Sequence, residues 1–245
     1  MHESIDWGTK NTSYTAALQG IKPTDDLNNW PKEHPAVQIA CETYFDEVVA
    51  LGRRLLRLFA LSLDLPETYF DEYTTGPACV ARVLHYPPQN PVTLDPTQIG
   101  IGAHTVSPPP SPLSAGNARA NGKDWELFTI LAQDDVPALQ VLNANNEWIQ
   151  ATPIKGTFVV NIADSLMRWT NDLFQSTVHR AINVSGKERF SIPLFWGADY
   201  DRRIKPLEQC VSATRPPRYE EIGVQEYIRW RSEQTYNVNL AKVGA

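Results

Sequence analysis

Residues 99–105 read IGIGAHT, residues 124–135 read DWELFTILAQDD, and residues 176–193 read STVHRAINVSGKERFSIP. These stretches contain short runs rich in β-branched and aromatic residues, which is typical of β-strands. Two of them carry a histidine, His104 and His179. Two histidines held by strands, together with a nearby carboxylate, are the ligand set of a non-haem iron site. The central part of the chain therefore predicts a β-sheet core that holds a metal ion.

The pattern around this centre predicts the rest of the fold. Turn residues divide the chain into about eight short strands, at 80–85, 99–105, 126–133, 138–142, 148–151, 157–162, 177–183 and 189–195. Strands of this length and spacing favour a sandwich or jelly roll over a parallel sheet. Helices are expected where apolar residues recur at steps of three and four, at 35–63 and 220–233, with a short helix near 65–71. The expected fold class is mainly β with flanking helices, a jelly roll with a long N-terminal helix and a C-terminal helix.

Length and composition restrict the class of protein further. The chain has 245 residues, 42% hydrophobic residues and a net charge of −6. An acidic chain is unsuited to nucleic acid or an anionic membrane, and no apolar run reaches the roughly 20 residues that span a bilayer. The N-terminus lacks the apolar core of a secretory signal, and three cysteines are too few for a disulfide framework. We expect a cytoplasmic monomer that binds a small molecule, with neither nucleic acid nor a membrane as partner.

A candidate anion site follows the second histidine. Arg189 and Ser191 are two residues apart on a predicted strand, so their side chains point to the same face. A guanidinium beside a hydroxyl is an efficient receptor for one carboxylate. Taken alone, the pair could equally be ordinary surface residues. Beside His179, it indicates a small acid bound next to a metal.

These motifs together resemble the iron(II)- and 2-oxoglutarate-dependent dioxygenases of the isopenicillin N synthase-like type, especially the fungal members. The resemblance extends over roughly residues 35 to 201. The matching segments are 86–87 (YP), 99–105, 124–135, 139–142 (LQVL), 156–164 (GTFVVNIAD), 167–171 (MRWTN), 176–180 (STVHR) and 188–193 (ERFSIP).

The resemblance implies a double-stranded β-helix with His104, Asp124 and His179 as the ligands of Fe(II). It also implies that 2-oxoglutarate is a co-substrate, its C5 carboxylate bound by Arg189 and Ser191 with Tyr86 as a further donor. O2 would be consumed to oxidise a C–H bond of a small organic substrate, by hydroxylation, desaturation or ring closure, within secondary metabolism.

The resemblance also gives a domain plan. We expect a helical N-terminal region at 1–77, a dioxygenase core at 78–201 with an insert at 106–123, and a C-terminal helical extension at 202–245. Family members carry a further portion before the long helix, so the N-terminal region is expected to be truncated.

The insert at 106–123 separates the first two expected ligands. The family motif is His-x-Asp, and without these 18 residues the sequence would read AHTDWELFT. The segment contains no Asp, Glu or His, and four of its first seven residues are proline, as in a solvated loop. We hypothesise a retained intron, because Val106-Ser107 and Lys123 can be encoded by splice-site sequences; the alternative is a natural lid loop. Because the insert interrupts the motif, we expect weakened or absent iron binding, with Glu126 a poor substitute ligand.

Two other functions remain open at this point. The chain could be an oxidase of the same fold that uses no 2-oxoglutarate, in which Arg189 and Ser191 hold the substrate's own carboxylate. It could also be a catalytically inactive protein that serves at most as a binding module. Succinate formation discriminates the first alternative, and iron titration of the chain with and without residues 106–123 tests the second.

Overall fold

The computed structural model describes residues 3–8, 28, 30–88, 101–104 and 124–236, with the side chains of 101–104 and 232–236 outside the description. Its strands are β1 (Glu3–Gly8), β2 (Cys79–Tyr86), β3 (Ile101–His104), β4 (Phe128–Gln133), β5 (Leu139–Leu142), β6 (Trp148–Gln150), β7 (Val159–Ile162), β8 (His179–Ala181), β9 (Arg189–Trp196), β10 (Arg203–Ile204) and β11 (Ile222–Gly223). Its helices are α2 (Pro35–Ser62), α3 (Asp164–Trp169) and α4 (Val224–Tyr236), with short 3₁₀ turns at Asp71–Tyr73 and Glu208–Cys210.

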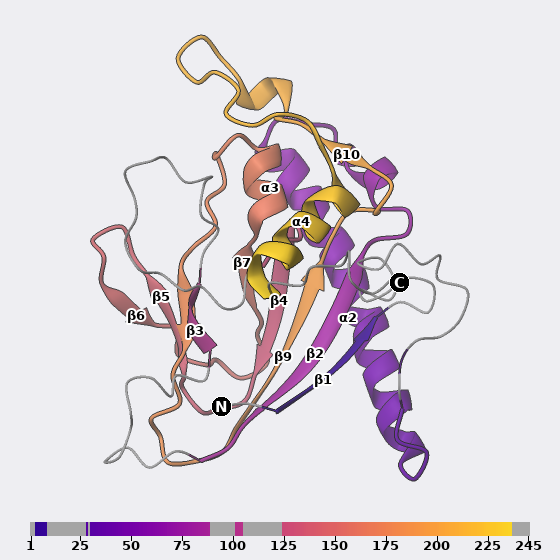
Figure 1. The fold of residues 1–245 in the computed structure, drawn as a ribbon, viewed down its shortest axis with the longest axis vertical. Helices are drawn as coiled ribbons and strands as arrows, with labels where there is room; N and C mark the ends of the chain where they lie inside the picture. The colour runs from indigo at the N-terminus through magenta and orange to yellow at the C-terminus, as the bar shows by residue number, and fades with distance from the viewer. Residues whose placement is uncertain (1–2, 9–27, 29, 89–100, 105–123, 237–245) are drawn as a thin grey trace, which may run out of the picture.

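Two antiparallel sheets form the framework. One has five strands in the order β1-β2-β9-β4-β7, and the other has four in the order β3-β8-β5-β6. In Figure 1 the five-stranded sheet occupies the centre, with β3, β5 and β6 to its left and α2 running along its other side. The expected class, mainly β with flanking helices, is confirmed. The remaining described strands, β10 and β11, form a separate two-stranded sheet, and the described strands do not close into a barrel.

Helix α2 covers the outer face of the five-stranded sheet. It begins at Pro35, whose fixed φ suits the first helical turn, and it matches the predicted extent to within a residue. Its buried residues are Phe45, Val48, Gly52, Leu56 and Ala60. The indole of Trp196 on β9 donates to the carbonyl of Val49 at 3.2 Å, which ties the helix to the sheet. Not every apolar residue of the predicted helical pattern faces the core, since Leu58 is 61% exposed.

Strand β9 has two different faces. Leu194 and Trp196 are fully buried in the hydrophobic core beneath α2. Alternate residues, from Arg189 and Ser191 to Phe195, line a cavity on the opposite face of the sheet. Because side chains alternate along a strand, one strand separates the core of the molecule from its cavity.

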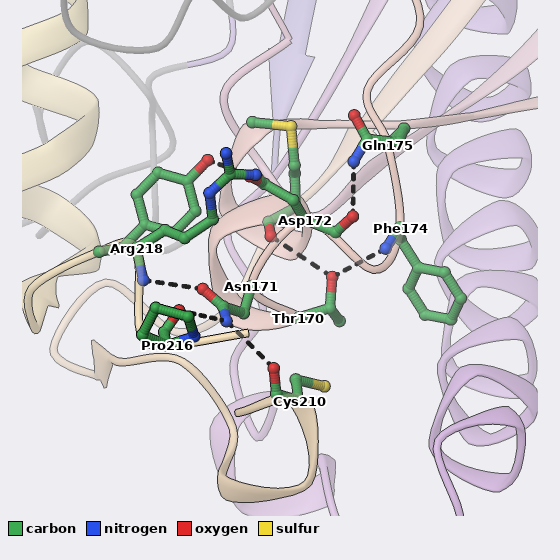
Figure 2. A network of polar contacts seen from close by, with 10 residues as sticks. Thr170, Asn171, Asp172, Phe174, Gln175, Cys210, Pro216 and Arg218 are labelled. Atoms are coloured by element: carbon green, nitrogen blue, oxygen red, sulfur yellow. Dashed lines mark hydrogen bonds and ion pairs between the residues drawn. The ribbon is translucent and has the colours of Figure 1, made fainter. Parts of the chain in front are cut away.

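A buried asparagine fastens the C-terminal segment to the end of α3. Asn171 has no exposed surface and adopts a left-handed backbone (φ 50°), which asparagine tolerates after a helix. Its side-chain amide donates to the carbonyls of Cys210 and Pro216, each at 3.1 Å, and accepts from the backbone N–H of Arg218 at 2.9 Å (Figure 2). The motif residue Asn171 therefore joins two segments of the chain.

Several elements differ from those predicted. Strand β1 lies in a stretch expected to be loop-like, and it pairs with β2 along its whole length. Helix α4 begins at Val224 instead of residue 220, because Ile222 and Gly223 pair with β10. The expected short helix near 65–71 is a turn followed by the 3₁₀ turn, and α3 was not predicted. Among the described helices, none is long and apolar enough to cross a membrane.

Candidate active site

A cavity of about 310 Å³ lies between the two sheets, lined by residues of β2, β4, β7 and β9 on one side and β5 and β8 on the other. Such a volume is at the lower end of the range for ligand pockets. Its apolar walls include Val80, Leu84, Leu131 and Phe195. Two groups of polar residues lie along it, one around Asp124 and the other around Arg189, and Asp6, Arg82 and Arg180 also line it.

Asp124 is fixed at one end of the cavity. Its side chain is 8% exposed, and Oδ2 accepts hydrogen bonds from the Thr129 hydroxyl and the Asn161 amide, each at 2.9 Å. The backbone of the same segment is also held, because the N–H of Asp164 at the start of α3 donates to the Asp124 carbonyl at 3.3 Å. The described contacts that hold Asp124 all come from residues that follow it in the sequence.

His179 on β8 faces Asp124 across the cavity. Its Nε2 lies 3.8 Å from Asp124 Oδ2. Its Nδ1 lies 3.0 Å from the carbonyl of Thr177, which can only accept, so Nδ1 carries a proton; in the neutral form of the ring, Nε2 then has the lone pair that can bind a metal. A hydrogen bond of this kind on the far ring nitrogen orients a histidine for metal binding. Since ligand atoms lie about 2 Å from a first-row cation, the two side chains are close enough to share one ion.

The backbone of His104 meets the same region. Strand β3 pairs with β8 in a register that sets His104 opposite His179. Among the described side chains, no third His, Cys, Asp or Glu joins Asp124 and His179. The side chain of His104 and the whole of the insert at 106–123 lie outside the described residues.

The second polar group is built around Arg189. This residue is 1% exposed, and its guanidinium donates to Ser191 Oγ and Gln133 Oε1, each at 3.2 Å. The ring of Tyr86 lies 4.8 Å from the guanidinium carbon. Burial raises the pKa of Tyr86 above its ordinary value. The charge of Arg189 and the hydrogen bonds to Ser191 and Arg189 act in the opposite direction and offset part of this increase. The three residues predicted to bind one carboxylate are therefore in contact with one another.

The charge of Arg189 has no counter-ion among the residues that the structure describes. Its described contacts are all neutral, and Nε is buried without a hydrogen-bond partner among the described residues. A buried, uncompensated cation is costly unless a ligand neutralises it. The arrangement suits a carboxylate that enters from the cavity.

Glu126 is adjacent to the site but is differently engaged. Its Oε2 accepts from the backbone N–H of Trp125 at 3.0 Å. Burial, and then the charge of Asp124, raises the pKa of Glu126 to about 7. Its position is consistent with the expectation that it would be a poor substitute for Asp124.

Three polar residues of the site were not predicted. Thr129 and Asn161 hold Asp124, and Gln133 holds Arg189. Asn161 was detectable in principle, since it is a lone amide in the apolar run of residues 159–162. The Gln133 contact depends on strand register, which short-range patterns do not supply, and Thr129 lies five residues from Asp124 but belongs to no pattern that marks it as a partner.

Comparison with known proteins supplies the family. The model of the 2OG-Fe(II) oxygenase superfamily matches residues 77–198. The 2-oxoglutarate-Fe(II) type oxidoreductase hxnY of Emericella nidulans is 37% identical over 213 residues, covering 85% of this chain and 56% of the relative. The chain belongs to the 2OG-Fe(II) oxygenase superfamily, whose cofactors are iron(II) and 2-oxoglutarate and whose co-substrate is O2.

Solved structures agree with this assignment. A full-length Neurospora crassa protein in complex with α-ketoglutarate superposes with a TM-score of 0.78 at 28% identity, covering 94% of this chain and 65% of that one. JOX2 in complex with 2-oxoglutarate, iron and JA superposes with a TM-score of 0.70 at 27% identity, over 93% and 59%. The chain spans about half the length of the first curated relatives it matches.

Proposed function

We propose that this chain is an Fe(II)- and 2-oxoglutarate-dependent oxygenase that oxidises a C–H bond of a small organic substrate. One observation carries the proposal. A single cavity is lined by a close carboxylate–imidazole pair, Asp124 and His179, and by a buried arginine, Arg189, that has no carboxylate partner among the described residues. A molecule that chelates iron and ends in a free carboxylate fits both.

Iron would be held by His104, Asp124 and His179. A carboxylate and two imidazoles leave open positions on the metal for a chelating co-substrate and for O2. Thr129 and Asn161 hold the carboxylate of Asp124, while the Thr177 carbonyl holds the imidazole of His179. These contacts orient Asp124 and His179 in the absence of a metal ion, which is the condition for an accurate site.

The C5 carboxylate of 2-oxoglutarate would bind Arg189 and Ser191, with Tyr86 as a third contact. When bound, iron and 2-oxoglutarate together supply the oxidising chemistry, with decarboxylation to succinate and CO2. Arg189 neutralises the carboxylate, Ser191 and Tyr86 direct it, and the apolar walls restrict the access of water. The residues of this chain therefore contribute placement and desolvation.

The alternatives are less well supported. Relatives and structural neighbours are named for 2-oxoglutarate or hold it, which favours its use over an oxidase that dispenses with it. The paired Asp124 and His179 disfavour an inert binding module and weaken the expectation that the insert abolishes iron binding. The expected monomer, its cytoplasmic location and a role in secondary metabolism are kept as part of this proposal. The Neurospora crassa protein has also been solved with thymine, so a small heterocycle belongs in the substrate screen.

The proposal is tested by iron and 2-oxoglutarate binding as well as by turnover. Calorimetric titration of 2-oxoglutarate into the Fe(II)-loaded chain without O2 should show saturable binding, and admission of O2 should release succinate. His179→Ala should lose iron affinity by about tenfold or more. His85→Ala changes a histidine on β2, in the other sheet, that does not line the cavity, so this control should leave iron affinity unchanged.

Arg189→Gln separates the two cofactors. We expect it to weaken 2-oxoglutarate binding by about a hundredfold, as expected for loss of a charge-assisted contact in a buried site, with iron affinity retained. Binding of iron without any binding of 2-oxoglutarate to the unaltered chain would contradict the proposal. So would succinate release that survives in His179→Ala.

A further inference from the structure

Two residues of the C-terminal helix α4 reach a buried carboxylate on α3. Tyr227 and Arg231 are four residues apart, so they lie on the same face of α4, one turn from each other. Both are buried, at 3% and 4% exposed. The Tyr227 hydroxyl donates to Oδ2 of Asp164 at 2.8 Å, and Nη2 of Arg231 lies 2.8 Å from the same oxygen. Two side chains of α4 therefore hold the first residue of α3, which continues from β7 in Figure 1.

The start of α3 in turn holds the segment that carries Asp124. The N–H of Asp164 donates to the Asp124 carbonyl at 3.3 Å, and the N–H of Ser165 donates to the Glu126 carbonyl at 3.0 Å. The Ser165 hydroxyl donates to the carbonyl of Trp125 at 2.6 Å. Three successive carbonyls thus accept hydrogen bonds from the first two residues of α3. The backbone of this segment takes its position from α3.

The buried ion pair is better suited to fix a position than to add stability. Taking Asp164 and Arg231 out of water costs free energy, and an apolar pair of similar volume is often at least as stable. Hydrogen bonds have a preferred direction, whereas apolar contacts do not, so the pair defines where the Asp164 side chain lies. A metal ligand must be held to within about half an ångström. A directional contact behind the segment of Asp124 meets that requirement.

We propose that Tyr227 and Arg231 are positioning residues for the iron ligand Asp124, and that they act through Asp164. The inference rests on the proposed function, because it takes Asp124 as a ligand of iron. The carboxylate of Asp124 is held directly from β4 and β7, as described above, while α4 fixes the backbone from which that carboxylate extends. None of the described residues of α4 lines the cavity. The C-terminal helix thus contributes to the accuracy of a site that it does not touch.

The experiment compares Tyr227→Phe with Tyr44→Phe, since each removes one tyrosine hydroxyl that donates a hydrogen bond. The Tyr44 hydroxyl donates to the carbonyl of Ile192 at 3.1 Å, between α2 and β9, and Tyr44 does not line the cavity. The two substitutions should lower the melting temperature by similar amounts. Fe(II) affinity is measured in the full chain without O2, and the visible absorption of Co(II) bound in place of iron reports on ligand geometry.

Tyr227→Phe should weaken Fe(II) affinity by about tenfold, as for loss of a group that supports a metal ligand, and it should change the Co(II) spectrum. Tyr44→Phe should leave both unchanged. Arg231→Leu should weaken Fe(II) affinity at least as much as Tyr227→Phe, because Asp164 loses its cation. Arg231→Lys keeps a cation beside Asp164 and should recover most of the affinity.

The inference is overturned if Tyr227→Phe keeps the Fe(II) affinity and the Co(II) spectrum of the unaltered chain. It is also overturned if Tyr44→Phe loses as much affinity, since general destabilisation would then account for the effect, or if Arg231→Lys binds iron no better than Arg231→Leu. Tyr227→Phe decides the matter should Arg231→Leu fail to fold. Equal iron binding by all the chains would overturn this inference alone, whereas absence of iron binding by the unaltered chain would overturn the proposed function with it.

Discussion

His85 lies on the outer side of β2 and is held between two strands by carboxylates. Its Nδ1 lies 2.9 Å from Glu3 on β1, its Nε2 lies 3.4 Å from Glu188 beside β9, and its ring stacks on Phe190. The hydrogen bond to Glu3 is the main cause that raises the pKa of His85 above its ordinary value of 6.5. The imidazolium form therefore fastens the edge strand β1 to the sheet.

This contact makes stability depend on pH in one direction. The pKa of His85 is higher in the folded than in the unfolded chain. The stability that its contact with Glu3 contributes is therefore fully present below pH 6.5 and is lost as the pH rises through the pKa of the folded state. The melting temperature of the unaltered chain should exceed that of Glu3→Gln most clearly at acidic pH, and the difference should shrink towards alkaline pH. Thermal unfolding across a pH series measures it. A difference that grows with pH would contradict the assignment.

At the residue scale, the sequence predicted those site residues that belong to recognisable motifs. His179, Arg189 and Ser191 were identified from spacing and alternation, and Asp124 from the resemblance. The partners Thr129 and Gln133, and the Asp6–Arg82 pair, were not identified. The contact of Thr129 with Asp124 is local, five residues apart, but no motif marks it. The contact of Gln133 with Arg189 and the Asp6–Arg82 pair join strands that are far apart in the sequence, and such pairs become visible only once the register is known.

Helix α2 approaches the sheet closely at a single glycine. A Cβ on Gly52 would lie 2.2 Å from Nε1 of Trp196, the indole that donates to the Val49 carbonyl. Gly52→Ala should lower the free energy of unfolding by about 1–3 kcal/mol, the cost of overpacking a tight contact. Urea unfolding followed by tryptophan fluorescence measures the change.

Gly76→Ala is the control for this prediction, because nothing lies within 4 Å of a Cβ built there. It should change stability by much less. Equal effects of the two substitutions would mean that the contact between α2 and Trp196 is not what restricts residue 52.

A buried ion pair connects α4 to the active site. Arg231 lies 2.8 Å from Asp164 Oδ2, and Tyr227 donates to the same oxygen at 2.8 Å. Asp164 has no exposed surface, and its backbone N–H supports Asp124. Arg231→Leu should cost about 3–5 kcal/mol, since it leaves a buried carboxylate without its cation.

The double variant Asp164→Asn, Arg231→Leu should recover part of this loss, because no charge then remains unpaired. Arg203→Leu removes an exposed pair with Glu221, at 2.6 Å, and should cost less than about 1 kcal/mol. Chemical unfolding of all three variants measures the differences. A cost for Arg231→Leu as small as that of Arg203→Leu would refute the role given to the pair.

At the element scale, the reliability of the prediction followed the strength of the signal. Helix α2 was predicted almost to the residue, because Pro35 marks its start and its period extends over many turns. Strand β1 was not predicted from the sequence, because polar and apolar residues alternate there over only a few positions. Its extended conformation is determined by its pairing with β2. Helix α3 has only six residues, too short for a helical period to be seen.

The whole molecule gives an expectation about residues 106–123. Asp124 is held by contacts that follow it in sequence, and lengthening a loop costs only about 0.6 kcal/mol per doubling. A variant lacking 106–123 should therefore bind iron with an affinity within about threefold of the intact chain. Parallel iron titrations of the two chains measure this. Much tighter binding by the shortened chain would restore the expectation that the insert impairs the metal site.

The overall class of the fold was predictable because many short strands with regular turns have few stable arrangements. The order β1-β2-β9-β4-β7 was not predictable from the residues, since it joins strands separated by more than a hundred residues. The position of the cavity depends on that order. The sequence thus indicated the chemistry of the candidate site. The residues that line the cavity could be identified only once the strand order was known.

The two faces of β9 have an evolutionary consequence. Pro193 and Phe195 border the cavity, while Leu194 and Trp196 lie in the core beneath α2. Single substitutions at the first two positions can change which molecules are accepted while folding is inherited intact. Insertion or deletion of one residue within β9 would turn the cavity-lining side chains towards the core and the core side chains towards the cavity. Both the cavity and the packing under α2 would then be lost. Descendants of this chain can therefore diversify along β9 by replacement, and changes of length are confined to its ends.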